Sequence, residues 1–223
     1  IDLLPKDLSK SCLVLTAGTT AAGAIDNLNI DSNAAWVHID GAWAGPLRIS
    51  QKYGYLLNGV ERADSISISG HKWIFQPKDS SILLFKNTAE ANESISVSAG
   101  YLSSSNIGIM GSRGAIGLPL LATLMAWGKV GLAERLDGCM TLSDELHSHL
   151  LETGVYIFAK PTSGVILWRP RAPCSADEIF LRLPAGSASL ATINSETWIR
   201  HVAANPNMEI DILCSEIETA LEY

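Results

Sequence analysis

A lysine and an aspartate in this sequence each follow a pattern typical of a buried β-strand. Lys72 comes shortly after the alternating run 63–68, and Asp40 ends the apolar run 35–40. Strands of this kind alternate apolar with small or polar residues. Lysine is rarely buried without a partner, so we interpret a partly desolvated amine at Lys72 as a candidate nucleophile for carbonyl groups.

Together the two residues suit chemistry on an aromatic aldehyde. Side chains at the carboxyl ends of neighbouring parallel strands share one edge of a sheet, so Asp40 and Lys72 are expected to face one ligand. In pyridoxal 5'-phosphate chemistry, a lysine amine forms a Schiff base with the cofactor aldehyde. An acidic residue keeps the pyridine nitrogen protonated, so that the ring acts as an electron sink. A surface lysine in a turn is the alternative interpretation of Lys72 on this stretch alone.

Six segments of the chain resemble the pyridoxal-dependent group II decarboxylases in order and spacing. That family includes the aromatic amino acid, histidine, glutamate and diaminobutyrate decarboxylases. The segments are Thr16-Ala17-Gly18-Thr19-Thr20, His38-Ile39-Asp40-Gly41-Ala42-Trp43, Gly59-Val60-Glu61-Arg62-Ala63-Asp64-Ser65, His71-Lys72-Trp73, Gly111-Ser112-Arg113-Gly114 and Val202-Ala203-Ala204-Asn205-Pro206. The resemblance implies an α/β fold of the aspartate aminotransferase type (fold type I), with a partial large domain and a small C-terminal α+β domain.

The resemblance also assigns roles to individual residues. Lys72 and Asp40 hold the cofactor, and the Ala42 methyl packs against the pyridine ring. Thr20 lies near the 3'-oxygen of the cofactor or the substrate carboxylate. His71 and Ser69 reach the cofactor phosphate, and His71 alternatively contacts the departing carboxylate. In the alternative interpretation, His71 is a packing residue and Thr20 belongs to an ordinary turn after a strand.

Residues 87–115 are polar and glycine-rich, and we expect them to be irregular. In the family, the corresponding region is a lid over the active site and a contact with the partner subunit. Ser112 then reaches the cofactor phosphate of that partner, which implies a homodimer with a shared active site. The loop departs from the family pattern because it has no tyrosine after Tyr101 to serve as a proton donor. A solvated linker is the alternative interpretation.

The remaining patterns divide the chain into three predicted parts. Residues 1–115 form the C-terminal part of the cofactor-binding domain, 116–150 form connecting helices, and 151–223 form the small domain. Within them, strands are expected at 12–16, 35–40, 63–68, 80–85, 155–159, 164–168 and 197–203. Helices are expected at 50–57 (ending at Gly59), 118–149 (buried at 118–127), 176–183 and 208–221 (with Asn207 as N-cap).

Composition excludes several classes of partner. The 223 residues carry a formal charge of −7 and no basic run, which argues against nucleic-acid binding. No apolar run approaches the roughly 20 residues that span a bilayer. The four cysteines are far apart and contain no Cys-x-x-Cys pair, so we expect reduced, mostly buried thiols in a cytoplasmic protein. His147 and His149 have no neighbouring ligand cluster, and no metal site is expected.

The predicted function is the decarboxylation of an L-amino acid to an amine and carbon dioxide, with pyridoxal 5'-phosphate held on Lys72. Members of the family are considerably longer, so the chain is expected to be a fragment or a subset of a longer polypeptide. Two alternatives stay open: another lyase or transferase of the same fold and cofactor, and a non-catalytic subunit. The substrate's identity does not follow from the sequence.

Overall fold

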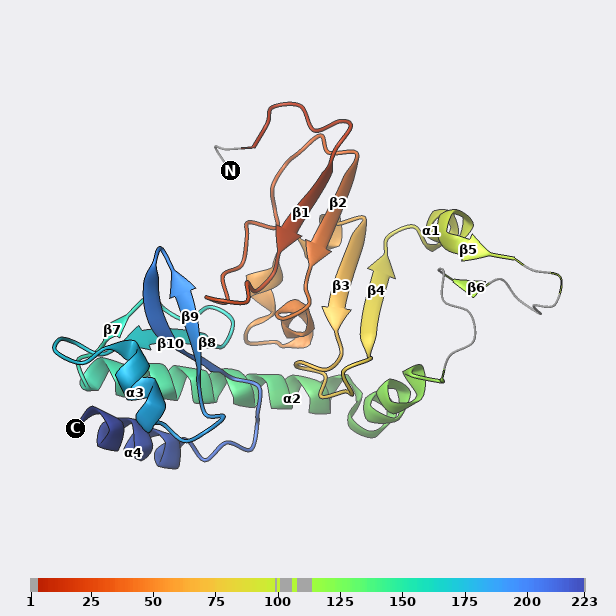
Figure 1. The fold of residues 1–223 in the computed structure, drawn as a ribbon. Helices are drawn as coiled ribbons and strands as arrows, with labels where there is room; N and C mark the ends of the chain where they lie inside the picture. Colours follow the sequence, from red (N-terminus) through yellow and green to blue (C-terminus); the bar gives the residue numbers. More distant parts are fainter. Residues whose placement is uncertain (1–3, 99, 101–105, 108–113, 223) are drawn as a thin grey trace.

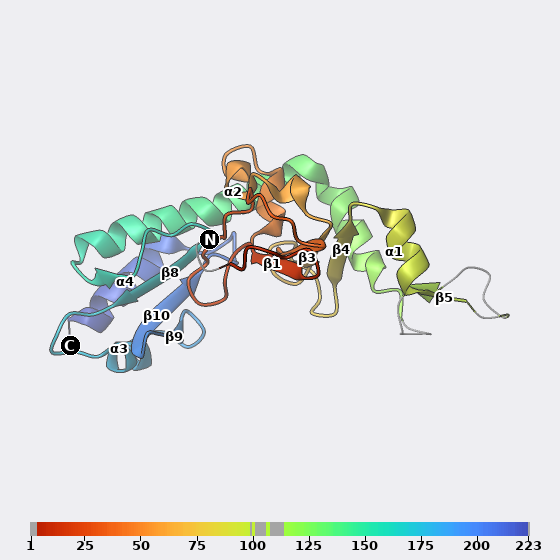
Figure 2. The same cartoon turned by 90° about the horizontal axis from the view of Figure 1, so that it is seen from above.

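The computed structural model of the protein describes residues 4–98, 100, 106–107 and 114–222. Two four-stranded sheets lie side by side, and the 36-residue helix α2 (Gly117–Glu152) runs past both of them (Figure 1). Seen from above, α1 (Thr88–Ile95) and β5 (Ser96–Val97) stand beyond the first, more N-terminal sheet, at the end far from the second, C-terminal sheet (Figure 2).

The first sheet carries the strand ends that the sequence singles out. Its strands lie in the order β1 (Cys12–Thr16), β2 (Trp36–Asp40), β3 (Ser65–Ser69) and β4 (Ser81–Phe85). The first three are parallel and β4 is antiparallel to β3. All four predicted strands are therefore confirmed, and the carboxyl ends of β1, β2 and β3 share one edge of the sheet.

One face of this sheet is packed and the other is open. Leu13, Leu15 and Ile39 are buried in a cluster that also contains Leu132 and Leu136 of α2. Because side chains alternate along a strand, Val14 points away from that cluster, and it is 56% exposed. Asp40 is on the open face too, because it immediately follows the buried Ile39 on β2.

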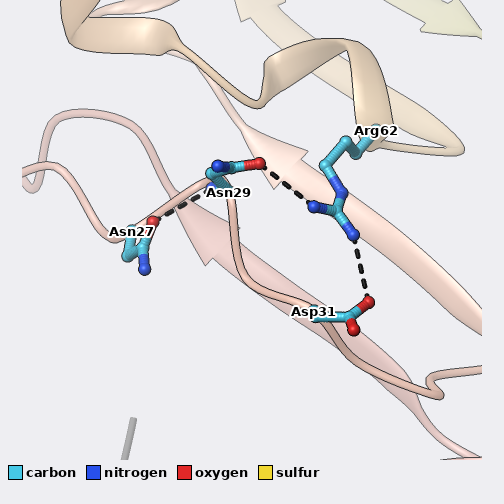
Figure 3. Close-up of polar contacts among 4 residues, drawn as sticks. All are labelled: Asn27, Asn29, Asp31 and Arg62. Carbon is cyan, nitrogen blue, oxygen red and sulfur yellow. Dashed lines mark hydrogen bonds and ion pairs between the residues drawn. The ribbon is translucent and has the colours of Figure 1, made fainter.

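The connection from β1 to β2 is irregular and contains no helix within its described residues. Arg62, shortly before β3, holds it in place by donating one hydrogen bond to Asn29 Oδ1 (3.1 Å) and one to Asp31 Oδ1 (3.1 Å) (Figure 3). Gly59 completes this contact. It has φ +99°, and a Cβ placed on it would lie 2.6 Å from the backbone of Leu28, so a larger residue would push the connection away.

The predicted helix 50–57 is wrong. The structure has three short 3₁₀ helices there instead: η1 (Gly45–Ile49), η2 (Gly54–Leu57) and η3 (Val60–Arg62). The backbone becomes extended at Ser50, where ψ is 136°. The Ser50 hydroxyl then accepts the N–H groups of Lys52 and Tyr53, and such side-chain bonds compete with a continuous helix.

Part of the region expected to be irregular is helical. Helix α1 (Thr88–Ile95) begins after Asn87, whose side chain accepts the N–H of Glu90 and donates to the Glu90 carboxylate. The Asn-x-x-Glu spacing in the sequence is the local signal for this reciprocal cap. Strands β5 (Ser96–Val97) and β6 (Asn106–Ile107) follow as an antiparallel pair. The expectations for Tyr101 and Ser112 fall outside the described residues.

Helix α2 confirms the long helical pattern, in which Gly128 and Gly138 are the expected interruptions. Its backbone is interrupted at Gly128 (φ 60°, ψ −172°), whereas Gly138 continues the helix. The expected burial of 118–127 is wrong. Leu118 is 61% exposed, Leu121 53% and Met125 77%, because only the side of the helix that carries Leu120 and Trp127 packs on the first core.

The second sheet is antiparallel, in the order β7 (Tyr156–Ile157), β8 (Val165–Arg169), β10 (Glu196–Val202) and β9 (Ser189–Ile193). Helices α3 (Ala176–Arg182) and α4 (Ile210–Leu221) pack with it around a second apolar cluster. These elements match the predicted α+β arrangement, except that β9 was missed. Asn207 is not the N-cap of α4; Glu209 holds that position, without a side-chain hydrogen bond.

The cysteines are less buried than expected. All four are free thiols, but only Cys139 is buried; Cys174 and Cys214 are half-buried, and Cys12 is exposed because it lies on the open face of β1. The expectation of mostly buried thiols is therefore wrong. Across the described residues, no helix is both long and apolar enough to cross a membrane. The described residues also contain no group of three or more metal-ligating side chains.

Candidate active site

The three parallel strands bring their final residues together at one edge of the first sheet. Thr16 lies opposite Asp40 on neighbouring strands, and Asp40 lies opposite Ser67 on β3. Backbone bonds extend the pairing beyond the strands, because Gly41 N–H donates to Ser67 O (2.9 Å) and Ser69 N–H donates to Ala42 O (3.3 Å). The turn that carries Ala42 is thus attached to the strand that leads to Lys72.

The turn after β2 orients the Asp40 carboxylate. Its Oδ1 accepts the backbone N–H of Ala42 at 3.0 Å, and its own backbone carbonyl accepts the N–H of Ala17 at 2.8 Å. Oδ2 has no hydrogen-bond partner among the described residues. One carboxylate oxygen therefore fixes the side chain, while the other is free to accept a hydrogen bond from a ligand such as a protonated ring nitrogen.

Lys72 lies in a tight turn immediately after β3. Its N–H donates to Ser69 O at 3.4 Å, and the turn is closed by Gly70 N–H to Ser80 O and by Gln76 N–H to Gly70 O, both 2.9 Å. The residue is half-buried, and within the described chain its amine has no hydrogen-bond or ion-pair partner. The turn therefore fixes the backbone of Lys72 and leaves the amine free to react.

The other predicted site residues differ in how closely they associate with this edge. Ala42 and Ser69 are half-buried and joined by the backbone bond described above. Thr20 and His71 are exposed, and no hydrogen bond of their side chains is present among the described residues. Ser112 lies outside the described residues. The structure thus groups Asp40, Ala42, Ser69 and the turn of Lys72, while the roles of Thr20, His71 and Ser112 stay predictions.

A polar network beside the site was not identified from the sequence. Ser65 Oγ accepts the indole N–H of Trp36 (2.8 Å) and lies 2.8 Å from His38 Nδ1, while His38 Nε2 lies 3.3 Å from Ser67 Oγ. All of these side chains share the face of Asp40. The alternation in residues 36–40 was the available signal, because residues two apart on a strand point the same way.

A second feature missed from the sequence connects the site to the second sheet. Trp43, three residues after Asp40, donates its indole N–H to Ser163 O at 2.7 Å. Trp73, directly after Lys72, donates to Ala203 O at 2.6 Å. The two rings lie against one another with centroids 4.4 Å apart. We call this pair of tryptophans and its two acceptors the tryptophan bridge.

The bridge also includes the loop after β1. The Ser163 hydroxyl donates to Gly23 O at 2.6 Å, so the loop that carries Thr20 is bonded to the same segment as Trp43. All of these bonds join residues more than a hundred positions apart. Three site loops are therefore positioned against residues next to β8 and β10, in a part of the chain that contributes no predicted catalytic group.

Comparison with known proteins places this geometry in a family. The pyridoxal-dependent decarboxylase conserved domain matches residues 7–169 of the 223. The chain belongs to this family. The family resemblance inferred from the sequence is thus confirmed, and with it the expectation of pyridoxal-dependent chemistry at the level of the family.

Individual relatives give the extent of the match. The chain is 29% identical to the aromatic-L-amino-acid decarboxylase of Bacillus atrophaeus over 192 residues, which cover 82% of this chain and 39% of that relative. Its fold resembles that of mouse CSAD in the apo form, with a TM-score of 0.80 and 22% identity over 95% of this chain and 52% of that chain. This likeness confirms the predicted fold class.

The fold is shared with a different kind of lyase. The sphingosine-1-phosphate lyase of Burkholderia pseudomallei K96243 matches with a TM-score of 0.77 and 17% identity, over 95% of this chain and 52% of that chain. The decarboxylase-family chain described here therefore spans between about two fifths and half the length of these three proteins.

Proposed function

We propose that the protein acts in the pyridoxal 5'-phosphate-dependent decarboxylation of an L-amino acid to an amine and carbon dioxide. The observation that carries the proposal is the placement of a carboxylate and an amine after neighbouring parallel strands, at one edge of the first sheet. Asp40 ends β2, and Lys72 follows the neighbouring strand β3 by three residues. Membership of the decarboxylase family supports the same function.

The free groups at the site fit this cofactor. It supplies an aldehyde that reacts with amines and a conjugated ring that accepts electrons. Lys72 offers a primary amine with no competing partner in the described chain, and Asp40 offers an unpaired carboxylate oxygen. Ala42 has a small side chain on the turn between them, where a flat ring can approach the backbone.

Each residue has a proposed task. Asp40 holds a proton on the ring nitrogen by accepting its hydrogen bond, and the Ala42 methyl packs against the ring. Lys72 binds the cofactor and afterwards moves a proton through its amine. Thr20 donates a hydrogen bond to the cofactor's 3'-oxygen or to the substrate carboxylate. Ser69, His71 and Ser112 contribute contacts to the phosphate.

The test separates cofactor binding from the reaction. The protein is loaded with pyridoxal 5'-phosphate, and we expect a visible absorbance band that is lost on Lys72→Ala. Lys78→Ala, an exposed lysine in the following turn, is the matched control and should keep the band. Asp40→Asn keeps an oxygen for the Ala42 N–H but removes the charge, and should lower activity by at least about 10²-fold.

Carbon dioxide release from a panel of L-amino acids then distinguishes the candidate functions. Release that depends on Lys72 supports decarboxylation. A cofactor band with no carbon dioxide from any amino acid favours another lyase, a candidate supported by the fold shared with sphingosine-1-phosphate lyase. Absence of the band in the protein would leave the non-catalytic subunit as the better proposal.

We further propose a cytoplasmic homodimer. The exposed apolar side of α2 supports the dimer, because Leu118, Leu121 and Met125 form a row that a second copy would cover. Four free thiols support a reducing compartment.

A further inference from the structure

A small cavity lies in the C-terminal half of the chain, away from the strand ends of the first sheet. It has a volume of about 50 Å³ and lies between α2, the inner strands of the second sheet and the segment before α4. Its walls are mostly apolar, with Leu142, Leu146, Ile166, Val202, Ile210 and Leu213 among them. None of its described lining residues is Asp, Glu, Lys or Arg.

Two buried polar groups on the cavity wall have no hydrogen-bond partner among the described residues. They are the Ser143 hydroxyl on α2 and His201 Nε2 on β10. The two residues are only 3% and 4% exposed. Buried polar atoms are nearly always hydrogen-bonded, so two orphaned groups on one cavity indicate a missing partner.

The surroundings of His201 determine what this partner must supply. His201 Nδ1 lies 3.1 Å from the carbonyl oxygen of Ser187, which only accepts, so Nδ1 carries the hydrogen. The ring is stacked on Trp168, with an angle of 9° between the planes. Burial lowers the pKa of His201 to about 4, so the ring is neutral near pH 7. Nε2 is therefore an acceptor that needs a donor.

We propose that this cavity binds the hydroxyl group of a small, uncharged alcohol. A hydroxyl group donates its hydrogen to His201 Nε2 and accepts the hydrogen of Ser143 Oγ, which satisfies both orphaned groups at once. Its carbon atoms then face the apolar walls. A charged ligand is excluded because the walls offer no opposite charge to offset its desolvation.

Water is the competing occupant, and size and wall chemistry favour the alcohol. A water molecule needs roughly 10–15 Å³ of such space and typically makes about three hydrogen bonds. This cavity is several times larger, and its described orphaned groups supply two bonds. A single water molecule here would keep one hydrogen-bonding position without a partner. In an alcohol, a carbon atom occupies that position and packs against the leucine and isoleucine side chains.

The test uses 2-propanol as the probe and the complete chain. Met208 lies in the cavity wall and is 37% exposed, so its methyl carbon is a suitable NMR reporter. We expect a saturable shift of this methyl signal, with a dissociation constant in the millimolar range that suits so small a ligand. Acetone accepts but does not donate, and should bind at least about tenfold more weakly because Nε2 stays unpaired.

A pair of serine variants on α2 gives the matched control. Ser143→Ala should weaken 2-propanol binding about tenfold and should not unfold the protein, because it removes an unpaired hydroxyl. Ser148→Ala, an exposed residue on the same helix whose hydroxyl bonds to Asp144 O, should leave binding unchanged.

Several outcomes would overturn the proposal. A Met208 shift that rises linearly without saturating indicates non-specific solvent effects. Equal affinity of the wild type and Ser143→Ala for 2-propanol would show that the Ser143 hydroxyl does not bind the alcohol. A crystal soaked in 2-propanol that shows only water between Ser143 and His201 identifies water as the occupant. No cofactor is needed, so the result is independent of the proposed decarboxylation.

Discussion

Asp40 and His201 each have one polar side-chain atom without a hydrogen-bond partner among the described residues. Asp40 uses Oδ1 for its own turn and keeps Oδ2 free, and His201 uses Nδ1 for Ser187 and keeps Nε2 free. In both, the first bond fixes the orientation of the second atom. The difference lies in exposure, because Asp40 is partly open to solvent and His201 is almost fully buried.

The burial of His201 makes folding stability depend on pH. Its pKa is about 4 in the folded protein and about 6.5 when exposed, so the unfolded chain binds more protons between these values. Stability is therefore complete above about pH 6.5 and falls as the pH drops toward 4, by on the order of 3 kcal/mol. Urea unfolding at a series of pH values should show this loss.

The variant His201→Gln isolates this contribution. Glutamine has no titratable group, so the difference in unfolding free energy between pH 7 and pH 4 should shrink relative to the wild type. An identical pH dependence in both proteins would show that other groups cause the acid sensitivity.

At the scale of elements, α2 depends on one glycine for its change of direction. Gly128 adopts φ 60° and ψ −172°, a conformation that is essentially restricted to glycine. Gly128→Ala should destabilise the protein by about 1–3 kcal/mol, even though a Cβ there would meet no atom within 4 Å.

Gly138 is the matched control in the same helix. A Cβ there also meets nothing within 4 Å, but the backbone is helical. Gly138→Ala should therefore stabilise the protein by about 0.5–1 kcal/mol. Thermal unfolding of the two variants should shift in opposite directions, and a shift in the same direction would contradict the assignment of strain to Gly128.

The tryptophan bridge is a second feature at this scale. Trp43→Phe keeps a ring but leaves the Ser163 carbonyl without its indole donor, so unfolding in urea should become easier by about 1–3 kcal/mol. Cofactor retention should also fall, because the turn after Asp40 loses its support.

Trp198 provides the comparison for the bridge. It is a buried tryptophan whose indole N–H has no hydrogen-bond partner, so Trp198→Phe loses ring volume without losing a bond. A smaller loss of stability in Trp198→Phe than in Trp43→Phe is expected. Equal losses would mean that ring volume, and not the hydrogen bond, accounts for the effect.

Local patterns predicted most of these elements, and the misses have both local and tertiary causes. The strands of the first sheet follow directly from apolar alternation, as in residues 36–40. Strand β9 was missed because Ser189–Ile193 is a short edge strand, in which Leu190 is partly exposed and the ladder is formed with β10. The tryptophan bridge depends on contacts across the whole chain, and no local pattern contains them.

At the scale of the whole molecule, the part of α2 that carries Leu118, Leu121 and Met125 exposes an apolar surface. The sequence predicted burial of 118–127 from hydrophobicity alone, which does not say whether another element or another chain provides the cover. Asp40 and Lys72 could be predicted to share one edge of the sheet because the carboxyl ends of parallel strands lie together there. The cavity at His201 follows no such rule and was not predicted.

The proposed homodimer can be tested by measuring the mass of the protein in solution. Leu121→Glu places a charge in the apolar row of α2 and should convert a dimer to a monomer in light scattering. Leu181→Glu introduces the same change at a residue of α3 that is 83% exposed and distant from the row, and should leave the mass unchanged. A wild-type chain that is monomeric at micromolar concentrations would contradict the proposal.

The tryptophan bridge also has a consequence for synthesis on the ribosome. The chain is made from its amino end, so both indoles emerge long before the carbonyl oxygens of Ser163 and Ala203 exist. Until those residues are translated, the hydrogen bonds that hold the turns after Asp40 and Lys72 cannot form. These two turns are therefore expected to reach their final positions only after residues 163 and 203 have been made.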